Sequence, residues 1–369
     1  MGDGGGGSLH DILASSIPSS HPHKYKVHYL VSPPTKHPSL YSSQPQPVKS
    51  PSKSKSSAST TCQHHLLLLS YESKFIYALE ILIYRSQSSP IIYISKADTT
   101  GFAPSSITRP ITTAFLRYLL QLTGGGIIQL FARSQPQYIF PCSATNGKKH
   151  ILDDTQLIKW WLRVLSPLKG KGKVYIPGVD KNKIKSYYPS SEDTWECTPP
   201  GFTEGEEDVL AKDVIPVFPD DPKARFLDDL RGDGQLSTTT LSQFWELMEH
   251  RQECSSGRLV GFISMVITRS KAVEGDDGVV VDEKMLTRAF EMLLNGDYSC
   301  DEIALGATTR WLESVSAIIP KEMKDKWGFE LIPSGKEGNG EVGIKKRPAE
   351  EVKPVNMLGG MLVRKKPKT

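Results

Sequence analysis

Three apolar runs close together in the sequence constrain the fold more than any other feature. They are Leu66–Ser70, Phe75–Tyr84 and Ile91–Ser95, and each is short and rich in leucine, isoleucine and tyrosine. Runs of this length and composition, bounded by polar residues, are typical of buried β-strands. Only Tyr71–Lys74 separates the first two runs, as in a hairpin. The chain must therefore contain a sheet with a large apolar surface that helices have to cover.

Helical periodicity then alternates with further short strands. We expect helices over Ile111–Leu122, Asp154–Leu165, Leu241–Arg251, Glu283–Asn295 and Asp301–Ile319, and strands over Ile127–Arg133 and Gln137–Phe140. Ser8 precedes Leu9, Ile12 and Leu13 at helical spacing, and Pro18 would end that helix. This order predicts a mixed α+β or α/β class, and the length of 369 residues allows either one large domain or two average ones.

Two segments and the C-terminus have a different composition. Residues 32–61 are mostly Ser, Pro, Lys and Gln, and residues 170–213 are rich in Pro, Gly and acids, so we expect both to be loops. Residues 334–369 form a predicted basic tail, in which Lys345–Thr369 contains eight cationic and two acidic residues, whereas the whole chain has a net charge of +4. Such a tail indicates a nuclear import signal or a phosphate-binding arm. The alternative is a solvated end without a partner.

Cysteine spacing and hydropathy exclude several classes of protein. The five cysteines show no C-x-x-C pair, so we expect no zinc or redox site and a reducing compartment. No apolar stretch approaches the ~18 residues of a membrane span. There is also no G-x-G-x-x-G motif and no phosphate-loop lysine, which disfavours kinases and other nucleotide hydrolases.

The first segment that suggests chemistry is Asp220-Asp221-Pro222-Lys223-Ala224-Arg225, which follows the apolar Val214–Phe218. Carboxylates at the edge of a core can be tuned by burial and by neighbouring charges to act as bases. The alternative is structural, because an aspartate before a proline in the first helical position is a good helix N-cap. Spacing alone does not separate these two interpretations.

The second segment that suggests chemistry is Ser95–Arg109, where a predicted strand leads through a turn into the start of a helix. The free backbone N–H groups of a helix start, together with Arg109, suit a pyrophosphate. A capped helix after a strand is also ordinary structure. Trp160 and Trp161 point about 100° apart on a helix, so one can face a cleft while the other packs in the core. His150 has no partner nearby in sequence, and a structural histidine is its alternative interpretation.

Taken together and in order, these segments resemble the fungal histone H3 lysine acetyltransferases of the KAT11 type, which are similar in fold to the metazoan CBP-type enzymes. The matching pieces are Ser95-Lys-Ala-Asp-Thr99, Gln137-Tyr-Ile-Phe-Pro141, Lys148-Lys-His-Ile-Leu152, Lys159-Trp-Trp161, Phe218-Pro-Asp-Asp-Pro-Lys-Ala-Arg-Phe226, Phe244-Trp-Glu246, Arg251-Gln-Glu253 and Arg364-Lys-Lys-Pro-Lys-Thr369. The nine residues around Asp220-Asp221 are the most specific piece. The resemblance covers the chain from about Leu9 to its end.

The resemblance implies an α/β fold with a single large domain over residues 1–333, in which helices surround a central mixed β-sheet. It also implies an enzyme that uses acetyl-CoA, without a metal, to acetylate histone H3. It implies cofactor contacts from Ala97, Asp98, Thr99, Ser105, Ser106, Ile107, Thr108, Arg109, Phe131, Gln135, His150, Ile151, Leu152 and Trp161. The implied catalytic residues are Asp221 as first choice of base, Asp220 as second, Tyr138 at the leaving thiolate and Trp161 along the channel. Lys223 would be autoacetylated.

The same resemblance implies lysine 56 of histone H3 as the main target and tail lysines as secondary ones. It further implies histone H3 bound to H4, histone chaperones of the anti-silencing-factor and NAP classes, a nuclear location, and roles in nucleosome assembly, transcription regulation and the response to DNA damage.

One departure from the family pattern lies between the predicted Ile111–Leu122 helix and Ile127–Arg133 strand. The family has a longer excursion at this point, whereas here Thr123-Gly124-Gly125-Gly126 makes the connection. A real deletion and a misassembled gene sequence both explain it. Two other functions therefore stay open: an inactive, shortened family member, and a nonenzymatic protein that binds chromatin or nucleic acid through its basic tail.

Overall fold

The computed structural model describes residues 7–42, 60–190, 194–202, 209–251, 257–268 and 270–334. The chain divides into two units, Met1–Lys336 and Glu337–Thr369. The second unit, and with it nearly all of the predicted basic tail, lies outside the described residues. None of the described helices is long and apolar enough to cross a membrane.

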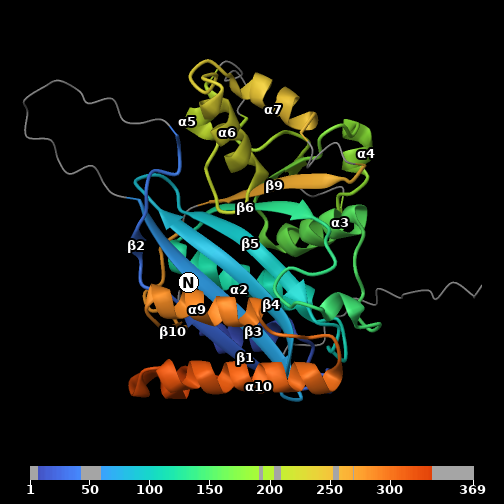
Figure 1. The fold of residues 1–369 in the computed structure, drawn as a ribbon, viewed down its shortest axis with the longest axis vertical. Coiled ribbons are helices and arrows are strands. Elements are labelled where there is room, and N and C mark those ends of the chain that lie inside the picture. The colour runs from blue at the N-terminus through green and yellow to red at the C-terminus, as the bar shows by residue number, and fades with distance from the viewer. Residues whose placement is uncertain are drawn as a thin grey trace, which may run out of the picture. The chain divides into compact units, whose positions relative to one another are not determined.

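A mixed sheet of eleven described strands forms the centre of the first unit (Figure 1). Its main path has the order β10-β1-β3-β4-β5-β6-β9-β7-β8, with β11 paired to β1 and β2 paired to β3. The strands are β1 Tyr25–Val31, β2 Thr35–Lys36, β3 Thr61–Tyr71, β4 Lys74–Arg85, β5 Ile91–Thr99, β6 Gly126–Arg133, β7 Lys171–Tyr175, β8 Trp195–Glu196, β9 Val260–Ile267, β10 Val279–Val280 and β11 Phe329–Leu331. Within the path, β5 and β6 run parallel, whereas β3–β4 and β6–β9 are antiparallel. The predicted mixed sheet is confirmed.

The hairpin between β3 and β4 follows from its turn. Glu72 and Ser73 both have left-handed backbones, with φ of 46° and 62°. Two central residues with positive φ give the turn whose twist matches that of paired strands. The turn aligns Leu66–Leu69 opposite Tyr77–Glu80.

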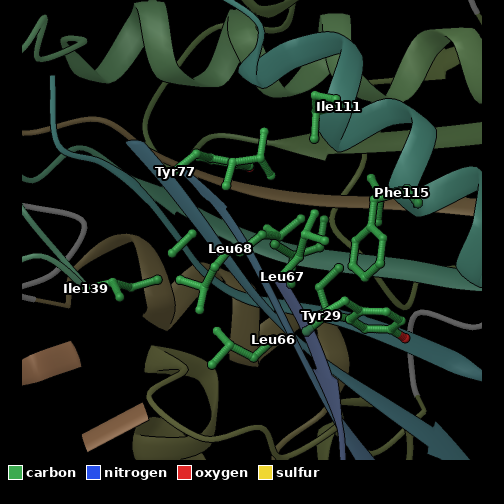
Figure 2. Close-up of a cluster of buried hydrophobic side chains, with 14 of the residues drawn as sticks. Tyr29, Leu66, Leu67, Leu68, Tyr77, Ile111, Phe115 and Ile139 are labelled. Atoms are coloured by element: carbon green, nitrogen blue, oxygen red, sulfur yellow. The ribbon is translucent and has the colours of Figure 1, made fainter. Parts of the chain in front are cut away.

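Helices cover both faces of this sheet. They are α1 Leu9–Ser16, α2 Thr108–Thr123, α3 Asp154–Leu165, α4 Lys181–Lys185, α5 Ala211–Val214, α6 Pro222–Gly232, α7 Leu241–Glu249, α9 Glu283–Leu294 and α10 Asp301–Ile318. Figure 2 shows Ile111 and Phe115 projecting from α2 toward Tyr29 and Tyr77 of the sheet, and the rings of Phe115 and Tyr29 lie 5.2 Å apart. On α10, Trp311 stacks edge-on against Phe75 at 5.1 Å. Burial on two sides explains the apolar runs Leu66–Leu69 of β3 and Phe75–Leu79 of β4.

The connection from α2 to β6 is a tight glycine turn. Gly124, Gly125 and Gly126 all have positive φ, of 66°, 90° and 148°. A Cβ on Gly126 would lie 2.6 Å from the Pro90 carbonyl oxygen. The Gly125 N–H donates to the Leu120 carbonyl at 2.8 Å, which closes the C-terminus of α2. The short connection is thus a well-formed αL turn.

Three local predictions are wrong. Residues 170–213 were expected to be a loop, but they contain β7, whose alternate residues Gly172 and Val174 are buried in the sheet. Gln137–Phe140 is not a strand, for a reason given below with the site. The 32–61 loop contains the two-residue strand β2, and 43–59 of it lie outside the described residues.

Candidate active site

A cleft of about 620 Å³ opens where the parallel neighbours β5 and β6 end. The carboxyl ends of adjacent parallel strands share one edge of a sheet, and ligands bind there in open α/β folds. The ends of β5 and β6, the start of α2, the segment before α3 and α3 itself form its walls. This is where most of the predicted site residues come together.

The cofactor residues implied by the resemblance all line this cleft except Ile107 and Arg109. Ile107 is 2% exposed and belongs to the core as the N-cap residue of α2. Arg109 lines a separate groove on the other side of the start of α2. Trp161 lines the cleft and, at 5% exposed, also belongs to the core cluster. The sequence had allowed a tryptophan of this pair either position, and Trp161 has both.

Asp98 lines the cleft, but its carboxylate organises the surrounding chain. Its Oδ2 accepts the backbone N–H groups of Tyr138, Ile139 and Phe140 at 2.7, 2.9 and 3.1 Å. Its Oδ1 lies 2.8 Å from Nζ of Lys149, and both side chains are about 95% buried. The predicted strand at Gln137–Phe140 is absent because a carboxylate, not a neighbouring strand, takes its N–H groups.

Asp220 is at the cleft, whereas Asp221 is not. The Asp220 backbone is left-handed, with φ of 57°, and its side chain is 74% exposed. Its Oδ2 accepts a hydrogen bond from Nζ of Lys96 at 2.8 Å. A non-glycine residue in this region of backbone space is uncommon and often occurs at functional sites.

Lys96 connects Asp220 to a buried polar chain. Its Nζ also lies 3.3 Å from the Glu80 carboxylate. That carboxylate accepts a hydrogen bond from the Ser95 hydroxyl at 2.6 Å and lies 3.1 Å from Nε2 of His64. Burial raises the pKa of Glu80, but His64, Lys96 and Ser95 together outweigh burial and lower it. Glu80 thus stays ionised beneath the cleft and anchors Lys96.

Asp221 caps α6, so the structural alternative for this residue is confirmed. Its side chain is fully buried, and its Oδ1 accepts the Lys223 N–H at 3.0 Å. The Lys223 ammonium, on a residue that is 3% exposed, pairs with the same carboxylate. The rings of Phe262 and Phe218 face that ammonium at 5.1 and 5.9 Å. Asp221 and Lys223 form an ion pair inside the core.

Tyr138 lines the cleft, and its hydroxyl group donates a hydrogen bond to the Arg133 carbonyl oxygen. Burial raises the pKa of Tyr138 to about 12, although the charge of Arg133 opposes this shift. It therefore carries its proton at neutral pH. His150 is exposed at the rim.

Three cations that line the cleft were not assigned as site residues from the sequence: Lys96, Arg133 and Arg225. Lys96 and Arg225 lie in segments that the sequence singled out, whereas Arg133 does not. Nε of Arg133 is buried and has no hydrogen-bond partner among the described residues. A buried donor without a partner is costly, and it is expected where a ligand completes the site. Arg133 is the last residue of β6, the strand that also carries Phe131. This position at the end of a predicted strand was the feature of the sequence that could have identified Arg133 as a site residue. Among the described residues, no group of three His, Cys, Asp or Glu side chains could hold a metal ion.

The structure thus defines a mixed α/β domain with a cleft at the shared edge of β5 and β6. The family model described as histone acetyltransferase KAT11-type domain matches residues 9–127 and 123–314. The chain therefore belongs to the KAT11-type histone acetyltransferase family. The two matched segments meet at the glycine connection after α2, where the sequence departs from the family pattern.

Individual relatives agree with this assignment. The chain is 32% identical to the histone acetyltransferase rtt109 of Aspergillus flavus over 70% of its own length, and it spans 56% of that relative. It is 29% identical to the histone acetyltransferase rtt109 of Schizosaccharomyces pombe, over 71% of this chain and 77% of the relative. The crystal structure of Rtt109 from Aspergillus fumigatus matches with a TM-score of 0.72 and 28% identity, covering 89% of this chain and all of that one.

Proposed function

We propose that this protein transfers an acetyl group from acetyl-CoA to lysine side chains of histone H3. The observation that carries the proposal is the cleft at the end of β5 and β6, which brings nearly all the cofactor residues implied by the resemblance together with Asp220. Family membership supports acetyl-CoA as the acetyl donor and a histone as the acceptor.

The residues of the cleft fit acetyl-CoA. Arg133 offers a buried donor without a partner, and the helix α2 begins without a side-chain cap or an acid in its first turn. Both features favour an anionic ligand such as a pyrophosphate. Ser105, Ser106 and Thr108 would hold that part. Lys148 and His150 would take the nucleotide end. Acetyl-CoA would supply the thioester whose carbonyl carbon the lysine amine attacks.

Asp220 is the better candidate for the base. A lysine amine must lose a proton before it attacks a thioester carbonyl, and an accessible carboxylate can accept the proton directly or through water. Asp220 lines the cleft, while Asp221 is buried and already engaged by Lys223. We therefore assign the proton transfer to Asp220 and a positioning role to Asp221, which reverses the order suggested by the resemblance. Tyr138 keeps its proton at neutral pH, and its hydroxyl group would orient the leaving thiolate by a hydrogen bond.

Autoacetylation of Lys223 remains part of the proposal. Acetylation removes the charge of a lysine and leaves an amide N–H that can still donate to Asp221. The neutral amide is less costly to bury than the ammonium. The modification would therefore suit the apolar surroundings of Phe218 and Phe262.

The finer parts of the proposal are the target, the partners and the location. They comprise lysine 56 of histone H3, H3 presented with H4 by a chaperone of the anti-silencing-factor or NAP class, and nuclear import through the basic tail. We propose residues 1–333 as the catalytic domain.

The test is mass spectrometry of histone H3 after incubation of the full chain with acetyl-CoA, H3–H4 and a chaperone. Acetylation at lysine 56 that is lost in Asp220→Asn supports the proposal. Retention on immobilised CoA without transfer would instead indicate an inactive, shortened member. Neither retention nor transfer would favour the nonenzymatic alternative.

A further inference from the structure

A second concave surface lies beside the start of α2, outside the catalytic cleft. It is a groove of about 450 Å³ between α2, the C-terminal end of α3 and Pro189. Three arginines line it: Arg109 and Arg117 from α2, and Arg163 from the last turn of α3. All three are exposed. We call this surface the arginine groove.

Among the residues that the structure describes, no acidic side chain balances the charge of the arginine groove. None of its lining residues is acidic, and none of the three guanidinium groups has an ion pair within the part of the chain that the structure describes. Arg109 is also in the first turn of α2, which holds no acid. A cation at that position opposes the helix dipole, so it costs the helix stability unless an anion binds nearby.

The groove is held in shape by contacts within the fold. The Thr113 hydroxyl lies between the two α2 arginines in sequence and donates to the Val164 carbonyl of α3 at 2.8 Å, a buried hydrogen bond. This bond ties α2 to the segment that carries Arg163. At 1.5 Å rise per residue, Arg109 and Arg117 are about 12 Å apart along the α2 axis. The cations therefore form an extended row, too long for one phosphate.

We infer that the arginine groove binds an extended acidic segment of another polypeptide. Guanidinium forks match carboxylates in a bidentate geometry. The remaining wall is formed largely by the rings of Pro110, Pro167 and Pro189 and by small residues, with no aromatic side chain. Single-stranded nucleic acid is normally bound through base stacking on aromatic residues, so the wall disfavours it. The positive charge of the groove also disfavours a basic segment as its occupant.

The experiment measures binding of a fluorescein-labelled twelve-residue polyglutamate peptide to the full chain by fluorescence anisotropy. Arg117→Glu with Arg163→Glu should weaken binding at least tenfold. The matched control is Lys183→Glu with Lys185→Glu, which reverses two exposed charges of α4 outside the groove and should change binding less than twofold. Arg117→Gln with Arg163→Gln should give an intermediate loss and keeps the test valid if the charge reversal unfolds the protein.

Equal weakening by the groove and control variants would overturn the inference, because it would mean that overall charge is responsible. The inference would also be overturned if Arg117→Glu with Arg163→Glu weakened the binding of a twelve-residue oligothymidylate but left the binding of the peptide unchanged. That result would favour nucleic acid as the partner. Neither result depends on acetyl transfer, so this inference can fail or hold independently of the proposed function.

Discussion

Replacing Asp221 with asparagine isolates the buried charge of this residue. Asparagine is also a good N-cap, so α6 keeps its cap while Lys223 loses its acidic partner. Lys223 is 3% exposed and packs against Phe262, which leaves its ammonium without water to solvate it. In protein whose Lys223 is unacetylated, removing one partner of this buried ion pair costs about 3–5 kcal/mol.

This loss is large enough to measure by thermal unfolding. At roughly 2.1 cal/mol/K per residue, a unit of about 300 ordered residues has an unfolding entropy near 0.6 kcal/mol/K. A loss of about 4 kcal/mol therefore lowers Tm by roughly 6 °C. Differential scanning calorimetry of Asp221→Asn against the unaltered chain measures it directly.

A second substitution decides whether the charge is the cause. In Asp221→Asn with Lys223→Met, no charge remains in the pair, and we expect most of the lost Tm to return. Asp220→Asn, at the exposed neighbour, should shift Tm by less than about 1 °C, since surface changes are usually within ±0.5 kcal/mol. If the double variant is no more stable than Asp221→Asn, the buried-pair reasoning is wrong.

Four further outcomes are expected. Asp220→Asn should lower kcat/KM for histone acetylation by about 10²–10⁴-fold with unchanged Tm, in radiometric assays, and near-normal rates would remove this carboxylate from the mechanism. Trp161→Phe should raise the KM for acetyl-CoA more than it lowers kcat; unchanged kinetics would assign Trp161 to the core alone. Burial, and then the charge of Lys26, lower the pKa of His28 to about 4. As pH falls, His28 is therefore protonated in the unfolded chain before it is protonated in the folded one. The free energy of unfolding falls below about pH 6.5 and is about 2 kcal/mol lower at pH 5. Urea unfolding at pH 7 and pH 5 should show this loss in the unaltered chain and not in His28→Phe, and an equal loss in the two proteins would contradict it. Deleting Lys345–Thr369 should reduce nuclear accumulation of a fluorescent fusion without lowering the Tm of the body, whereas loss of soluble protein would mean that the segment packs on the fold.

Most regular elements could be predicted because their signals are local. α3 begins and ends where its periodicity and the Asp153 cap indicate, at Asp154 and Leu165. The strand β5 was predicted to end at Ser95 but runs to Thr99, because polar Lys96 and Asp98 pair with β4 while their side chains line the cleft. Polar residues at a functional strand end remove the apolar pattern on which the prediction depends.

The contacts that organise the site are long-range, so the sequence pattern could not reveal them. Asp98 accepts N–H groups from residues forty or more positions away, which converts a predicted strand into a bend. Lys96 joins Glu80 of the neighbouring strand β4 to Asp220, which lies 124 positions further along the chain. The motif around Asp220 and Asp221 identified the place. Only the fold shows which of the two carboxylates is accessible.

The glycine turn after α2 also determines where this fold can grow. The helix ends and the strand begins within four residues, so the two ends of any segment inserted there would already be adjacent. The entropy of closing a loop rises slowly, by about 0.6 kcal/mol for each doubling of its length. An appendage of almost any size can thus be added or removed at Gly125 without moving β5, β6 or the cleft between them. Selection, or an engineer, can therefore change the chain length at this position without rearranging the sheet.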